Sequence, residues 1–244
     1  MRQIVLTYRI RIVLLDYDLT LVSNILDFYD AYNEALKNFL GKTVSFNKFY
    51  DLLINYRLDY FLGKDIDKEA FWRFFRKNYR SMYGYPVDGA YYFLYWVKNM
   101  NMKSVIISGR ECHPDVLYYE LRRFGLDEYI DEIYTLFNLY VVGGVEEELF
   151  DKTWLIRYVL KKHGIDPSEA VYIGDYRLDY ISSKKAGVEF IGVAFDPERK
   201  ECLYRVGAKY VGENLYDALY YLLEIIRDNK NRKKKGRYLE TNYK

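Results

Sequence analysis

The sequence of 244 residues is 50% hydrophobic and 19% aromatic with a formal net charge of +2, which is the composition of a globular protein. Its length favours one main domain with a large insertion over two independent domains. Cys112 and Cys202 form no cluster, so neither a disulfide framework nor a structural zinc site is indicated, and we expect both to be small buried hydrophobic residues.

No hydrophobic run approaches the about 20 residues that cross a bilayer, and the first residues lead into a charged strand end without a cleavage-site pattern. We therefore expect no membrane segment and a cytoplasmic location. Residues 229–244 hold seven Lys or Arg against one acid, Glu240, so this segment carries +6 and the rest of the chain −4. The composition predicts a solvated, disordered tail, and nucleic acid is the less favoured alternative.

Short hydrophobic runs predict five strands. The run Ile12–Leu15 ends abruptly in carboxylates, which is typical of a buried parallel strand whose carboxyl end opens to solvent. Similar runs occupy residues 104–107, 133–136, 171–173 and 190–193. One helical pattern starts at Pro114, and three others cover residues 153–163, 178–186 and 215–227. Strands that alternate with helices predict an α/β fold with a doubly wound parallel sheet.

Residues 21–85 interrupt this alternation. Hydrophobic residues recur there at steps of three and four, as in Phe71, Phe74 and Phe75, and Ser45 and Asp67 stand where helix N-caps belong. The pattern predicts a small helical bundle inserted after the first strand. The expected domains are a core of residues 1–20 and 86–228, the helical insertion, and the basic tail.

Carboxylates follow two of the predicted strands. Asp16 and Asp18 are two positions apart, with Thr20 two further on, so in an extended chain both carboxylates face one side. Two carboxylates this close require a cation to remain charged together, although a surface turn is an alternative interpretation. Asp175 ends the fourth strand, and Asp179 follows in the first turn of a helix, where its charge also suits the helix dipole.

Three further residues could contact an anion. Ser108 ends the second strand, and its hydroxyl, with the N–H groups of the turn at Gly109, could hold a phosphoryl oxygen. Lys152 precedes the helix of residues 153–163 and could bring a positive charge to the same place. A turn serine and a solvated lysine are the alternatives.

Four segments together resemble the motifs of the haloacid dehalogenase superfamily. They are DYDLT at residues 16–20, VIISGR at 105–110, Lys152 before a helix, and GDYRLD at 174–179. Their order, strand context and spacing agree with the family, over residues 11 to about 223. The resemblance implies a Rossmann-like core, and it implies that the insertion is a helical cap like that of the phosphoglycolate phosphatase group.

The resemblance also implies roles for the acidic residues. Asp16 would be the covalent nucleophile, Asp18 the general acid and base, and Thr20 would shape the turn. Mg²⁺ would be held by the Asp16 carboxylate, the backbone carbonyl of Asp18, and Asp175, while Asp179 would support a metal-bound water or the lysine.

By the same resemblance, Ser108, Gly109 and Lys152 would bind the oxygens of the transferred phosphoryl group. An aspartate at position 18 resembles the phosphatase and mutase branches, so hydrolysis of a small phosphomonoester is the leading prediction. A phosphomutase, a phosphonate hydrolase that uses Lys64, and a non-catalytic protein that binds through its basic tail are the alternatives.

Several basic residues of the insertion could meet a second anionic group of the substrate, but solvated helix faces are the favoured interpretation for them. They are Arg57, Arg73, Arg76, Lys77 and Arg80. His113 is expected to start a helix rather than to act in the chemistry.

Overall fold

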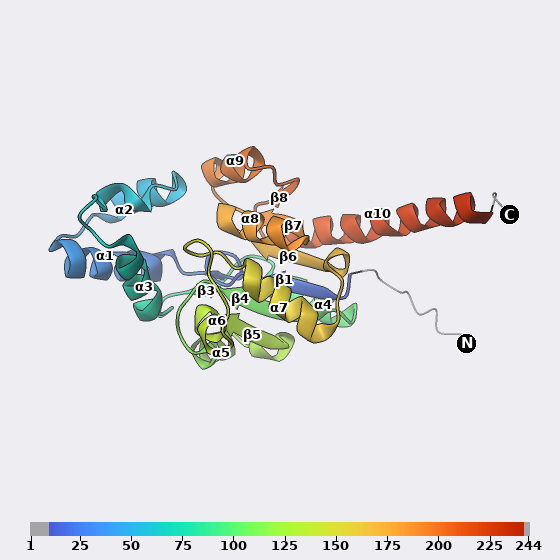
Figure 1. Cartoon of the computed structure of the whole chain (residues 1–244), viewed down its shortest axis with the longest axis horizontal. Helices are drawn as coiled ribbons and strands as arrows, with labels where there is room; N and C mark the ends of the chain where they lie inside the picture. Colours follow the sequence, from blue (N-terminus) through green and yellow to red (C-terminus); the bar gives the residue numbers. More distant parts are fainter. Residues whose placement is uncertain (1–9, 242–244) are drawn as a thin grey trace.

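The computed structural model describes the backbone of residues 10–241 and the side chains of residues 10–228. Six parallel strands form one sheet in the order β5-β4-β1-β6-β7-β8, and the expected doubly wound α/β fold is confirmed (Figure 1). The strands are β1 (Ile12–Leu15), β4 (Lys103–Ser108), β5 (Glu132–Thr135), β6 (Ala170–Gly174), β7 (Glu189–Val193) and β8 (Tyr210–Gly212).

Helices cover both faces of the sheet, because alternate residues of the central strands point to opposite hydrophobic layers. Val13 and Leu15 face one layer, and Ile12 and Leu14 face the other. The first layer includes α4 (Ala90–Asn99), α5 (Pro114–Arg123) and α10 (Leu215–Thr241). The second includes α6 (Leu136–Val141), α7 (Thr153–His163), α8 (Arg177–Ala186) and α9 (Pro197–Arg205). Two 3₁₀ turns, η2 (Asp127–Tyr129) and η3 (Pro167–Glu169), connect these elements.

Some elements differ from the sequence predictions. The helices α4 and α9 and the strand β8 were not expected. The third predicted strand stops at Thr135, where a capping box with Asn138 starts α6 at Leu136. Cys112 is buried as expected, but Cys202 is only half-buried.

The C-terminal segment also differs from its prediction. The backbone of α10 is helical to Thr241, although a disordered tail was expected from residue 229. Lysine and arginine have a high helix propensity, which is compatible with a helical backbone here although like charges on one helix repel. The side chains beyond Asp228 and residues 242–244 lie outside the described part of the chain.

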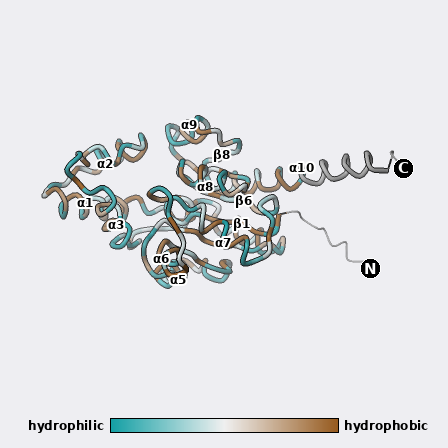
Figure 2. The backbone as a smooth tube through the Cα atoms, viewed as in Figure 1, coloured by the Kyte–Doolittle hydropathy of each residue, from teal (hydrophilic) through white to brown (hydrophobic). Residues whose placement is uncertain are grey.

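The insertion consists of α1 (Ile25–Leu40), α2 (Phe46–Ile54), η1 (Leu58–Phe61) and α3 (Lys68–Asn78), and it lies at one end of the molecule (Figure 1). Brown and teal stretches alternate along these helices in Figure 2, as amphipathic helices require. Their hydrophobic faces form a cluster separate from the two layers of the core. Ser45 and Asp67 cap α2 and α3 through the N–H groups of Lys48 and Ala70, as expected.

Two short antiparallel strands join the insertion to the core. They are β2 (Val22–Ser23) and β3 (Tyr85–Pro86), with Val22 opposite Pro86 and Ser23 opposite Tyr85. The chain therefore enters and leaves the insertion at the same place.

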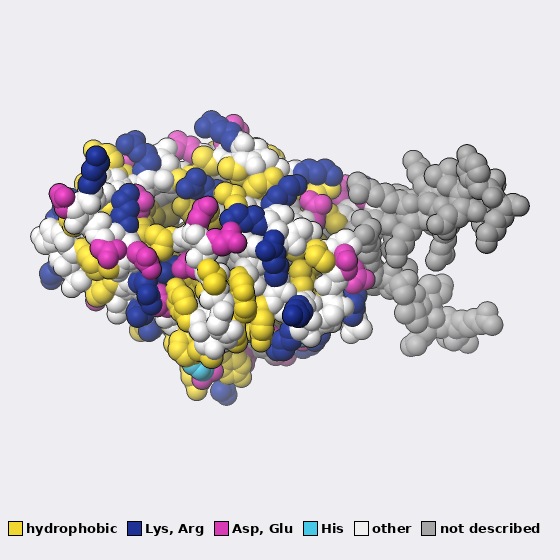
Figure 3. Space-filling model, in the orientation of Figure 1, with side chains coloured by type: hydrophobic (Ala, Val, Ile, Leu, Met, Phe, Trp, Pro, Cys, Tyr) yellow, Lys and Arg dark blue, Asp and Glu magenta, His cyan; other side chains and the backbone are white. Residues whose placement is uncertain are grey.

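On the face drawn in Figure 3, exposed hydrophobic side chains gather over α6 and the loop after it, among other places. Val141 and Val145 are 66% and 63% exposed there, whereas Leu136 and Leu139 of α6 are fully buried. The α6 segment is therefore hydrophobic on both sides. Among the described residues, no helix has both the length and the hydrophobicity needed to cross a membrane.

Candidate active site

A pocket of about 330 Å³ lies where the carboxyl ends of β1, β4 and β6 meet the insertion. Its lining contains six of the eight site residues that the sequence predicted. They are Asp16, Asp18, Gly109, Lys152, Asp175 and Asp179. The carboxyl edge of a parallel sheet is where ligands of such folds bind, because the strand ends there open toward the loops.

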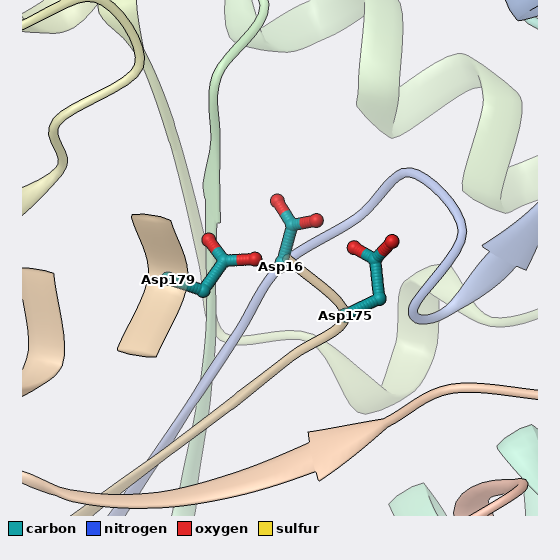
Figure 4. Close-up of side chains that lie close together, drawn as sticks. All are labelled: Asp16, Asp175 and Asp179. Carbon is teal, nitrogen blue, oxygen red and sulfur yellow. The ribbon is translucent and has the colours of Figure 1, made fainter. Parts of the chain in front are cut away.

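Three carboxylates gather on the floor of this pocket. Asp16 follows β1, Asp175 follows β6, and Asp179 lies in the first turn of α8; the three side chains point to the same side in Figure 4. Carboxylate oxygens of the three residues lie within 4.8 Å of one another, and all three residues are buried. A Cβ on Gly174 would come within 2.7 Å of the Asp179 carboxylate, so glycine at this position allows the close approach.

Lys152 compensates the charge of this cluster. Its ammonium donates to Asp16 Oδ1 at 2.5 Å and to Asp179 Oδ1 at 2.7 Å, and the residue is only 5% exposed. The alternative of a solvated lysine is therefore wrong. Its backbone N–H donates to Ser182 Oγ at 3.0 Å, and this hydroxyl donates to Asp151 at 2.9 Å, which fixes the start of α7 against α8.

Burial controls the protonation of this cluster. Burial raises the pKa of the Asp16 carboxyl well above its ordinary value; Lys152 opposes the shift, and the neighbouring carboxylates add to it. Burial alone would lower the pKa of Lys152, but Asp16 and Asp179 raise it well above its ordinary value. The lysine is therefore held in its charged form by two buried carboxylates.

Arg199 of α9 is a second buried cation, which the sequence did not reveal. It donates to Asp175 Oδ2, and it is only 2% exposed. Burial raises the pKa of Asp175, and the guanidinium of Arg199 opposes this shift. Thr20 donates to the other oxygen of Asp175 at 3.1 Å, so this threonine lies behind the carboxylates and does not line the pocket.

Asp18 is held by Arg110, which belongs to the VIISGR segment but was given no role. The guanidinium donates to Asp18 from Nε at 3.0 Å and from Nη2 at 2.6 Å, and Asn24 donates to the same carboxylate at 2.6 Å. Arg110 is buried and also donates to Glu120 at 2.8 Å. The Asp18 side chain is therefore on the pocket wall, and its charge is compensated there.

Gly109 and Ser108 occupy different places. Gly109 lines the pocket, and a Cβ on it would lie 3.3 Å from Phe150 and 3.7 Å from the Lys152 side chain. Ser108 is fully buried and lies outside the pocket lining; its hydroxyl accepts the N–H of Arg110 at 3.1 Å. In this structure the serine supports the turn.

The basic residues of the insertion divide into two groups. Arg57, Lys77 and Arg80 are exposed, as the favoured interpretation expected. Arg76, in contrast, is only 1% exposed, lines the pocket, and donates to Glu146 at 2.6 Å. The solvated interpretation is therefore wrong for Arg76, because a carboxylate of the core compensates its charge inside the protein.

The remaining sequence candidates lie away from the chemistry. Arg73 is half-exposed and donates to Glu111 at 3.0 Å. His113 is the N-cap of α5, as expected, and accepts the N–H of Asp115 at 3.3 Å. Lys64 is exposed and does not line the pocket.

The donor set of the floor fits a hard divalent cation. Asp16, Asp175 and Asp179 offer only carboxylate oxygens, which suit Mg²⁺ or Ca²⁺ and not a soft metal. Six acidic and five basic side chains line the pocket, so a phosphate dianion would enter a site without excess positive charge. A divalent cation at the three carboxylates would supply that charge.

Solved structures of other proteins share this fold. A predicted phosphatase from Clostridium acetobutylicum is 20% identical, with a TM-score of 0.67 over 88% of this chain and 99% of that one. A predicted phosphoglycolate phosphatase from Haemophilus somnus is 17% identical, with a TM-score of 0.63 and the same coverage. A search of curated proteins gave no match. The family model for haloacid dehalogenase-like hydrolases matches residues 13–193, which include all four motifs. The chain is therefore a hydrolase of the haloacid dehalogenase-like family.

Proposed function

We propose that this hydrolase is a Mg²⁺-dependent phosphatase that cleaves small phosphomonoesters through a phosphorylated Asp16. Support comes from the floor of the pocket, where one ammonium, that of Lys152, contacts both Asp16 and Asp179 beside Asp175. This arrangement combines a nucleophilic carboxylate, a fixed positive charge for phosphoryl oxygens, and hard oxygen ligands.

In the first step, an oxygen of Asp16 attacks phosphorus while the bond from phosphorus to the ester oxygen breaks. Lys152 holds Asp16 Oδ1 at 2.5 Å, whereas Oδ2 accepts only a long hydrogen bond of 3.5 Å from Thr20, so Oδ2 is proposed as the attacking oxygen. Asp18 donates a proton to the departing ester oxygen, so the alcohol leaves neutral. For this donation, the Asp18 carboxyl has to move from Arg110 toward the leaving oxygen.

In the second step, Asp18 takes a proton from water, and the resulting hydroxide attacks phosphorus. The bond between Asp16 and phosphorus breaks, and inorganic phosphate leaves. Lys152 and the N–H groups at Gly109 stabilise the equatorial oxygens in both steps. Ser108, which lies outside the pocket lining, is proposed to contribute by holding the turn that carries these N–H groups. The two steps leave the enzyme unchanged and consume one water molecule.

The ligands proposed for Mg²⁺ are the carboxylates of Asp16 and Asp175 and the backbone carbonyl of Asp18, with Asp179 nearby. When bound, the ion would offset the negative charge between nucleophile and phosphate and polarise the phosphoryl group. Residues 21–85 are proposed to act as a cap over residues of the core (1–20 and 86–228), because their side chains form the pocket wall that faces the three carboxylates. The substrate would be a small soluble phosphate ester.

The test is release of inorganic phosphate from an aryl phosphate with Mg²⁺ or with EDTA. Asp16→Asn should lower turnover by about 10³-fold or more, because an amide is a poor nucleophile. Asp30→Asn, on an exposed position of α1, should retain the wild-type rate. Full activity of Asp16→Asn, or activity that persists in EDTA, would contradict the covalent, metal-dependent mechanism.

A further inference from the structure

The wall of the pocket opposite the three carboxylates is hydrophobic. It is formed by side chains of the insertion and of the loop before α7, among them Phe28, Leu53, Tyr56, Leu58, Trp72 and Phe150. The Trp72 indole N–H donates to Asp59 at 2.8 Å, so its one polar atom already has a partner. A ligand on this side meets mainly hydrocarbon and aromatic rings, with the hydroxyl of Tyr56 and the charged side chains of Asp59 and Arg76 beside them.

Several of these side chains keep exposed area. Phe28, Tyr56, Leu58 and Phe150 are half-buried, whereas Phe49 and Phe71 in the centre of the same cluster are fully buried. The aromatic surface toward the pocket is therefore incompletely covered in the ligand-free protein. Covering it with an apolar group is favourable.

Most basic residues of the pocket, in contrast, already form ion pairs, although Nε and Nη2 of Arg76 and Nε of Arg199 have no hydrogen-bond partner. Arg76 is paired with Glu146, Arg110 with Asp18, and Arg199 with Asp175. Lys152 is paired with two aspartates. Arg177 lines the exposed rim and has no ion pair among the described residues, but two carboxylates outside the acidic cluster, Asp59 and Glu148, line the same pocket.

A second anionic group on the substrate would therefore displace a buried ion pair, or it would lie beside the carboxylates that already pair with the buried arginines or beside Asp59 and Glu148. Displacing one partner of a buried pair is costly, because the other charge is left unpaired in a low-dielectric site. The wall that contacts the leaving group favours an uncharged, hydrophobic one.

We infer that the substrate is the phosphomonoester of an aromatic or similarly hydrophobic alcohol that carries no second acidic group, and that Phe28 is a specificity-determining residue. This inference rests on the proposed phosphatase function, and it adds the class of the leaving group. Phe28 contacts Phe75 and Tyr79, with ring centroids 4.9 and 5.5 Å away, so its ring is held in place at the pocket wall.

Binding of phosphonates, which this mechanism does not cleave, separates specificity from chemistry. Isothermal titration of the full chain with saturating Mg²⁺ would compare benzylphosphonate, methylphosphonate and phosphonoacetate. Benzylphosphonate should bind at least about 10-fold more tightly than methylphosphonate, because its ring is removed from water. Phosphonoacetate should bind no more tightly than methylphosphonate. Tighter binding of phosphonoacetate than of benzylphosphonate would overturn the inference.

Three variants on the same helix test the role of Phe28. Phe28→Ala should lower the preference for benzylphosphonate over methylphosphonate by about 5-fold, and Phe28→Leu should restore part of it. Phe39→Ala is the matched control: Phe39 is also half-buried on α1 and packs in the same cluster, but it does not line the pocket. An equal loss of preference in Phe28→Ala and Phe39→Ala would refute the assignment.

The outcomes also separate this inference from the proposed function. Binding of methylphosphonate together with hydrolysis of an aryl phosphate would support a phosphatase, whichever analogue binds best. Absence of binding by all three phosphonates and absence of hydrolysis would refute the phosphatase, and with it the inference. A phosphatase that prefers phosphonoacetate would refute the inference alone.

Discussion

Substitution of Arg199 by methionine tests the buried ion pair beneath the acidic cluster. Arg199 and Asp175 are 2% and 4% exposed, so the variant leaves the Asp175 carboxylate buried without its cation. Breaking such a pair costs about 3–5 kcal/mol. Thr20 still donates to Asp175, so we expect the lower end, about 3 kcal/mol, which corresponds to about 6–12 °C in melting temperature for a protein of this size.

Magnesium should reverse much of this loss if Asp175 is a ligand of the ion. In the variant no guanidinium competes for the carboxylate, so Mg²⁺ should bind more tightly and stabilise the variant more than the wild type. Urea unfolding in EDTA and in excess Mg²⁺ measures both effects. An Arg199→Met protein that gains no more from Mg²⁺ than the wild type would place the ion away from Asp175.

Arg205→Met is the matched control for this experiment. Arg205 lies on the same helix and pairs with Glu201 at 3.1 Å, but its side chain is 71% exposed. Exposed pairs contribute about 0–1 kcal/mol, so this variant should unfold nearly as the wild type does. If Arg199→Met and Arg205→Met lose the same free energy of unfolding in EDTA, burial of the ion pair is not what makes it important.

Two further predictions concern the supports of the site. Gly174→Ala should shift the Asp179 carboxylate, lower the turnover and lower the free energy of unfolding by about 1–3 kcal/mol. Gly63→Ala is the control and should change neither quantity, because the space around its Cβ position is open. Turnover assays and urea unfolding measure both effects. Partial burial tends to raise the pKa of Asp151, but hydrogen bonds from Thr153 and Ser182 hold this pKa below its ordinary value. The stability lost in Asp151→Ala, about 1–3 kcal/mol by unfolding at pH 7, should therefore be present above about pH 4 and disappear as the pH falls through that lowered pKa.

The parallel sheet could be predicted because its central strands are buried on both faces, so each appears as a short hydrophobic run that ends in polar residues. The helix α4 was not predicted, because it too has hydrophobic residues on more than one side. Its outer face carries Tyr91, Tyr92, Tyr95 and Trp96, so hydrophobic residues surround the whole helix and the helical period is obscured. The helix α9 has an N-cap aspartate, Asp196, followed by proline, and this signal could have located it.

The acidic residues of the site could be predicted because strand ends place them locally. Their cationic partners could not. Arg110 and Asp18 are 92 positions apart, and Arg199 and Asp175 are 24 apart, so only the folded chain brings each pair together. Asp179 acts both in the site and at the start of a helix, as its two interpretations expected. One oxygen accepts a hydrogen bond from Lys152, and the other accepts the N–H of Tyr176 in a capping box.

The ribbon of β2 and β3 makes the insertion an interchangeable module. Because Val22 lies opposite Pro86 and Ser23 opposite Tyr85, the two chain ends of residues 24–84 are neighbours, and a short turn could close the ribbon in their place. The hydrophobic cluster of the insertion is separate from the two layers of the core, so its exchange would leave those layers intact. If the insertion selects the leaving group as proposed, evolution and protein design can change that group by exchanging one continuous piece of chain, while the carboxylates and the lysine keep their places on the sheet.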